Sequence, residues 1–148
     1  MGDTAGLMRK VFKAWARKDL ASFSRCLADN FSHTIHVPMT VSNLAGPCIG
    51  KSVAAARLEA ISRSYDILAY EVGPIMTSKD GKRAAAQVAV RYRHIPSGIL
   101  LETEIGYFAV LHEDKLVRLD EYHDVDKLTA FTSAAWPPAT ADAGQGSQ

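Results

Sequence analysis

Apolar side chains recur at a spacing of three to four residues in three segments of the first 65 positions. The first segment predicts an amphipathic helix over residues 5–18, with basic residues on its other side. Asp19 is the expected N-cap of a second, short helix. A third helix is predicted to begin near Ser52, with an apolar stripe of Ala54, Leu58, Ile61 and Tyr65. Between the second and third helices, "FSHTIHVP" alternates like a strand that Pro38 ends.

From residue 67 onward the apolar period changes to two, which is typical of half-buried strands. Turn signals follow at "KDG" (79–81), "PSG" (96–98) and "ED" (113–114). The order is therefore helix, helix, strand, helix and then four strands in an antiparallel meander. This order predicts an α+β domain with helices packed on one face of a sheet.

The predicted turns determine which residues face each other across the sheet. A two-residue turn at 97–98 places Arg91 opposite Glu104, and one at 113–114 places His123 opposite Glu104 and Glu121 opposite Gly106. One face of the meander is then charged and the other is apolar, with Val88, Val90, Ile105 and Tyr107. A slip of one residue would exchange the faces. The pattern alone slightly favours a solvated charged face and a core on the apolar face.

Composition and charge narrow the function classes. The 148 residues suit one domain, expected over residues 1–132, with a mobile tail over 133–148 that contains "WPPATADAGQGSQ". The formal net charge is +1, which argues against a nucleic-acid partner. No apolar stretch approaches the roughly 20 residues that span a bilayer. The first twenty residues do not resemble a secretory signal, and two cysteines without a CxxC motif suit a reducing compartment, so a cytoplasmic protein is expected.

Several segments in a fixed order resemble one known superfamily. They are "AWARKDLASFSRCLADNF", "HVP" after the first strand, the glycine at position 50, and "HEDKLVRLDEYHD" near the end of the sheet. The sequence resembles the nuclear transport factor 2-like superfamily over residues 7 to about 130, in its SnoaL-like and ketosteroid-isomerase-like branch. The resemblance implies a cone: a curved, mostly antiparallel sheet wrapped around about three N-terminal helices and enclosing an apolar pocket.

The resemblance also assigns the two sheet faces. The row with Gly106 and Glu121 would point into the cone, and the outer face of the sheet would form a homodimer through Val90, Ile105 and Tyr107. Gly106 stands where ketosteroid isomerases and limonene-epoxide-hydrolase-like enzymes carry an acid, so neither activity in its strict form is expected.

The remaining polar residues suggest acid–base chemistry. Glu121 matches a second catalytic acid of the epoxide hydrolases, and His36 matches a residue that orients water. A histidine beside a carboxylate can act as a general base, so His123 with Glu104 is a candidate pair. The predicted substrate-binding residues are Arg91, Trp15, Phe12, Leu58, Tyr65, Phe108 and Leu119. His33, His94 and His112 are expected at the surface or sheet edge. A metal site is not favoured, because His33 and His36 lie on opposite sides of a strand and make a poor chelate.

Two functions remain open at this point. The first is a cofactor-free, metal-free acid–base enzyme of isomerase, cyclase, dehydratase or hydrolase type, acting on a small, largely apolar or aromatic organic ligand. The second is a non-catalytic small-molecule-binding or dimeric interaction module of the same fold. Neither implies a nucleic-acid or membrane partner.

Overall fold

The part of the chain that the structure describes, residues 3–42 and 44–137 of a computed structural model, forms four helices and one sheet of seven strands. In chain order the elements are α1 (Thr4–Ala16), α2 (Leu20–Arg25), β1 (Leu27–His36), β2 (Gly46–Ile49), α3 (Lys51–Ser64), β3 (Tyr65–Val72), β4 (Met76–Thr77), β5 (Arg83–His94), β6 (Leu100–His112), β7 (Lys115–His123) and α4 (Val125–Ala135).

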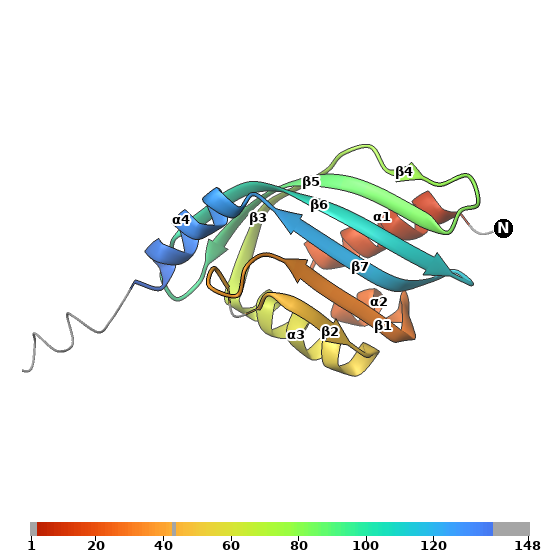
Figure 1. The fold of residues 1–148 in the computed structure, drawn as a ribbon, viewed down its shortest axis with the longest axis horizontal. Helices are drawn as coiled ribbons and strands as arrows, with labels where there is room; N and C mark the ends of the chain where they lie inside the picture. The colour runs from red at the N-terminus through yellow and green to blue at the C-terminus, as the bar shows by residue number, and fades with distance from the viewer. Residues whose placement is uncertain (1–2, 43, 138–148) are drawn as a thin grey trace, which may run out of the picture.

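The sheet is mostly antiparallel and curves around α1, α2 and α3 (Figure 1). Its strand order is β2-β1-β7-β6-β5-β3, with β4 paired to β5 outside this path. The predicted fold class is therefore confirmed. One feature that the sequence did not predict is the parallel pairing of β1 with β7, which brings the first long strand beside the last.

Local sequence accounts for the ends of the helices. The Asp19 side chain accepts a hydrogen bond from the backbone N–H of Ser22, as predicted for an N-cap. The third helix begins at Lys51, one residue before the predicted start near Ser52. Its N-cap is Gly50, whose φ of 100° favours glycine. The fourth helix was not predicted at all. It reaches Ala135, three residues into the expected tail, and the tail beyond residue 137 lies outside the described residues.

The β5–β6 hairpin has a different register from the predicted one. Its connection is longer than two residues, and Arg91 pairs with Glu102 while Glu104 pairs with Ala89. The shift relative to the prediction is two residues, an even number, so each side chain stays on its predicted side of the ribbon. The predicted cross-strand pair of Arg91 with Glu104 is nevertheless wrong.

A β-bulge changes the faces of β7. Glu113 and Asp114 form the predicted two-residue turn, both with positive φ (49° and 61°). The register then shifts between Val110 and Leu111, because β7 carries one extra residue at Val117. Beyond the bulge, each side chain of β7 lies on the opposite side from the one predicted relative to β6, so Glu121 no longer shares a face with Gly106. Glu121 pairs with Tyr107, not with Gly106.

The core lies between the helices and the apolar side of the meander. Val88, Val90, Ile105 and Tyr107 are all at most 5% exposed and pack inside, so the predicted dimer surface on these residues is wrong. Arg91 and Glu104 are exposed on the outer face. The apolar face of the meander, and not the charged face, packs against the helices because its burial removes more apolar area from water. No helix among the described residues is long and apolar enough to cross a membrane.

Candidate functional site

Three ionisable side chains meet on the inner face of the sheet where β1 lies beside β7. Parallel pairing sets Ile35 next to Glu121, and His33 is two residues before Ile35 on the same face of β1. His123 follows Glu121 by two residues on β7 and shares its face. The bulge at Val117 is thus responsible for turning Glu121 and His123 inward.

Both carboxylate oxygens of Glu121 contact a histidine. Oε2 pairs with Nε2 of His33, and Oε1 lies 3.3 Å from Nε2 of His123. The His33 side chain is fully buried, and the side chains of Glu121 and His123 are 12% and 10% exposed. We name this group the His33–Glu121–His123 cluster. It is a carboxylate held between two imidazoles inside the fold.

Arg57 on α3 reaches the far side of His33. Its Nη2 lies 3.3 Å from Nδ1 of His33, 3.4 Å from the His33 carbonyl oxygen and 3.1 Å from the Gly46 carbonyl oxygen. A guanidinium can only donate hydrogen bonds, so Nδ1 of His33 is the acceptor. The proton of neutral His33 is then on Nε2, where it is donated to Glu121.

The free nitrogen of the cluster belongs to His123. Its Nε2 faces Glu121, whereas its Nδ1 is among the buried side-chain atoms of the described residues that have no hydrogen-bond partner. A donor on Nε2 leaves a lone pair on Nδ1 of the neutral ring. The Glu121 carboxylate would stabilise the imidazolium that forms when Nδ1 takes up a proton.

Glu121 is held in its ionised form. Burial by itself would raise the pKa of this carboxyl. In the acidic range where the carboxyl titrates, the charge and hydrogen bonds of His33 and His123 outweigh burial and hold the pKa far below its usual range. The carboxylate is therefore suited to orienting and stabilising a neighbouring histidine, and poorly suited to taking up the proton itself.

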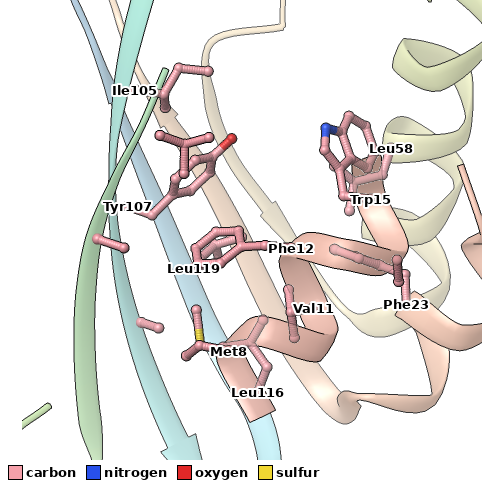
Figure 2. Packing of buried hydrophobic residues seen from close by; sticks show 14 of the residues in the cluster. Met8, Val11, Phe12, Trp15, Phe23, Leu58, Ile105, Tyr107, Leu116 and Leu119 are labelled. Atoms are coloured by element: carbon pink, nitrogen blue, oxygen red, sulfur yellow. The ribbon is translucent and has the colours of Figure 1, made fainter. Parts of the chain in front are cut away.

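A small cavity beside Glu121 opens between the sheet and the helices. Four of the predicted substrate-binding residues line it, namely Phe12, Trp15, Leu58 and Leu119, together with Val11, Phe23, Tyr70, Tyr107 and Glu121. Figure 2 shows the Tyr107 hydroxyl and the Trp15 nitrogen pointing into the space between β6 and α3. The cavity volume is about 20 Å³, room for roughly one water molecule.

Three buried tyrosines lie close enough to Glu121 to be affected by its charge. Burial raises the pKa values of Tyr70, Tyr92 and Tyr107 well above the ordinary range, and the Glu121 charge adds to the shift. All three remain protonated and able to donate hydrogen bonds. The Tyr92 hydroxyl also accepts a bond of 3.1 Å from the Trp15 ring nitrogen.

The other predicted site residues lie away from this cavity. Glu104, predicted to pair with His123, is on the outer face and accepts a bond from Gln87 instead. Arg91 and Phe108 are also on the outer face, where Phe108 is 54% exposed. Tyr65 packs against Tyr92, His94 and Phe131 at the α4 end.

His36 points to the outer face of β1, opposite to His33. Its Nε2 lies 2.9 Å from Oδ1 of Asp120, and its ring stacks on Tyr122 with centroids 4.3 Å apart. His36 and Arg118 hold the pKa of Asp120 below its usual value although burial opposes this. The predicted place of His36 among the polar residues of the pocket is therefore wrong.

Sequence reasoning missed His33 and Arg57. His33 was expected at the surface, but it lies between Phe31 and Ile35 in the alternation of β1, and this apolar neighbourhood is a signal for the buried face. Arg57 directly precedes Leu58, and Leu58 belongs to the apolar stripe of the third helix. His94, also expected at the surface, is 3% exposed and lies 2.7 Å from the Ser97 hydroxyl.

The donors of the cluster do not form a metal site. Within residues 3–42 and 44–137, no three or more His, Cys, Asp or Glu side chains are arranged to hold a metal ion. Arg57 gives a chemical reason at His33, because a metal bound at Nε2 would require the proton to be on Nδ1, where the guanidinium already donates.

Solved structures with the same fold carry several kinds of name. A "Putative Isomerase" from Rhodopseudomonas palustris has a TM-score of 0.73 at 17% identity, covering 88% of this chain and 97% of its own. A "putative polyketide cyclase" from Pseudomonas putida has a TM-score of 0.75 at 20% identity, and the match covers 88% of this chain and 98% of the cyclase chain. An NTF2-like protein of unknown function from Burkholderia pseudomallei has a TM-score of 0.75 at 15% identity, and the match covers 92% of this chain and 99% of the other chain.

These likenesses identify the fold. The chain has the nuclear transport factor 2-like fold, as the sequence resemblance implied, and the matched structures are covered almost over their full length. No protein-family model matches the sequence, and no curated protein matches it significantly.

Proposed function

We propose that this protein is a cofactor-free acid–base enzyme that moves a proton on a small, largely apolar molecule. The observation that carries the proposal is Glu121, a buried carboxylate that lines an apolar cavity and has both oxygens engaged by histidines. Perturbed ionisable groups of this kind are concentrated at functional sites. The isomerase and cyclase names of the structural neighbours are compatible with such chemistry.

In this proposal His123 is the general base. Its Nδ1 is free of partners among the described residues, and Glu121 fixes the ring through Nε2. Neutral tyrosines at the cavity, Tyr70 and Tyr107, would donate hydrogen bonds to an oxygen on which negative charge develops. The reaction class is isomerisation, cyclisation, dehydration or hydrolysis.

Substrate entry requires the cavity to widen. Pockets for small molecules usually measure roughly 300–1,000 Å³, and the space beside Glu121 is about 20 Å³. The bulky rings at its wall, Phe12 and Trp15, therefore have to move or repack when a ligand binds. A ligand with a flat apolar body and one polar oxygen fits this lining best.

The test is a screen for deuterium exchange from D₂O into small ketones and enones, followed by turnover assays. General acid–base groups contribute about 10²–10⁴-fold, so His123→Ala should lower kcat by that factor. His112→Ala is the matched control, since the His112 side chain is 68% exposed. Turnover that neither His123→Ala nor Glu121→Gln reduces would refute the assignment.

The rival function makes a different prediction in the same screen. A non-catalytic binding module would bind a ligand saturably without any turnover or exchange. Its affinity would depend on wall residues such as Phe12 and Leu58 and would be insensitive to His123→Ala.

We also propose that the protein forms a homodimer through the outer sheet face. This proposal rests on two exposed aromatic rings in the middle of that face: Phe108 and Tyr122 are 54% and 45% exposed and touch edge to face at 5.5 Å. Exposed aromatic residues in contact are typical of interface centres. A second copy of the chain would cover them.

A further inference from the structure

We propose that Arg57 is a positioning residue that keeps His33 neutral, so that the negative charge of Glu121 is reserved for His123. The inference rests on the proposed acid–base function and assigns a role to two residues, Arg57 and His33, that act through Glu121. It follows from the hydrogen-bond geometry of the cluster.

The first step concerns the lone pair of His33. Nη2 of Arg57 lies 3.3 Å from Nδ1, and the same nitrogen is anchored by the carbonyl oxygens of Gly46 and His33. Since the guanidinium has no acceptor to offer, a proton on Nδ1 of His33 would lose this bond and face a cation. A second proton on His33 would therefore cost the ring its hydrogen bond to Arg57.

The second step concerns Glu121. If His33 became an imidazolium, it would form a complete ion pair with Glu121 and neutralise it. With His33 neutral, Glu121 remains the uncompensated anion next to His123. The carboxylate can then stabilise the imidazolium that His123 forms when its free Nδ1 takes a proton from substrate.

The ionisable groups around the cluster support this reading. They are Arg57 on α3, His33 on β1, His123 on β7, Tyr70 on β3, Tyr92 on β5 and Tyr107 on β6. The tyrosines are neutral donors. Among the described residues, Arg57 is the one permanent cation within hydrogen-bond distance of the cluster, and it touches His33 only.

The test is the protonation state of each imidazole, read from long-range ¹H–¹⁵N spectra of protein with ¹⁵N-labelled histidine. His33 and His123 are assigned with His33→Gln and His123→Gln. In the wild type at pH 7, His33 should be neutral with its proton on Nε2. Removal of a cation this close should raise the imidazolium fraction of His33 at least ~10-fold in Arg57→Met.

Two further variants separate positioning from a structural role. Arg57→Lys keeps a cationic donor and should retain the neutral state of His33. Arg63→Met, on the same helix, removes an exposed arginine paired with Glu59 and should change nothing. In a turnover assay Arg57→Met should lower kcat with little change in KM, and Arg57→Lys should restore most of the loss.

The wild-type spectrum alone can overturn the inference, even if Arg57→Met does not fold. An imidazolium at His33 in the wild type at pH 7 would do so, and so would an unchanged His33 in folded Arg57→Met. Because the spectra need no substrate, this failure is distinct from failure of the proposed function. A protein without turnover could still show the predicted His33 state.

Discussion

Replacing Glu121 by glutamine keeps the shape of the side chain and removes its charge, which isolates what the carboxylate contributes to stability. Hydrogen bonds to a charged group contribute about 1.5–3 kcal/mol each, and Glu121 accepts two. The carbonyl oxygen of glutamine can keep one of these two hydrogen bonds as a neutral acceptor. Its amide N–H₂ group is a donor, however, and would face the N–H of the second imidazole, which is also a donor. One buried donor is then left unsatisfied, at a cost of about 1–3 kcal/mol. We expect Glu121→Gln to lower the free energy of unfolding by about 2–4 kcal/mol at pH 7.

The pH dependence makes this prediction specific. The folded-state pKa of Glu121 is depressed, so its ionised form contributes stability that is fully present above the ordinary value of 4.5. That stability is lost as the pH falls through the folded pKa. Other carboxyl groups titrate equally in both proteins, so the difference between wild type and Glu121→Gln should narrow progressively below pH 4.5.

Urea unfolding followed by tryptophan fluorescence between pH 7 and pH 3 measures this difference. Glu104→Gln is the matched control, because Glu104 is exposed on the outer face and its change should stay within about 0.5 kcal/mol. A difference below about 0.5 kcal/mol at pH 7 for Glu121→Gln, or one that stays constant down to pH 3, would refute the reasoning.

Three further predictions concern the outer face and the cavity. Phe108→Glu should yield monomers in sedimentation velocity, because it places a charge in the centre of the proposed dimer surface; a wild-type monomer would remove the basis of that proposal. Gly106→Ala should change stability by less than about 0.5 kcal/mol and leave any turnover intact, since a Cβ there meets Tyr122 at an ordinary 3.9 Å; a large loss would mean that Gly106 does not face outward. Phe12→Ala should cost about 3–5 kcal/mol and create space that indole fills, raising Tm; calorimetry that detects no indole binding would show that the cavity had collapsed.

Most of the fold could be predicted from the sequence because the period of the apolar residues is locally determined. The helix over α1, the Asp19 cap and the Glu113–Asp114 turn depend on neighbours within a few residues. The helix α4 was missed because its buried residues are few, Phe131 and Ala135, and they give a weak stripe.

The candidate site was predicted only in part, and for a physical reason. Glu121 and His123 were correctly expected in the interior, but the predicted partner of His123 was Glu104. The one-residue bulge in the β6–β7 hairpin separates these residues onto opposite faces. The two-residue shift in the β5–β6 hairpin changes the cross-strand partner of Glu104 without changing its face. His33 and Arg57 join the cluster through the parallel pairing of β1 with β7, a long-range contact that no local pattern specifies.

The single extra residue at Val117 also bears on how such a site could arise or disappear. Deleting one residue at the bulge would restore an unbroken ladder, and every later side chain of β7 would change sides. Asp120 and Tyr122 would then face inward and Glu121 and His123 outward. In this fold, a one-codon insertion or deletion near the β6–β7 turn can exchange one set of polar residues for another without any substitution at the site. Libraries that vary the length of this strand would therefore reach arrangements that point mutagenesis cannot.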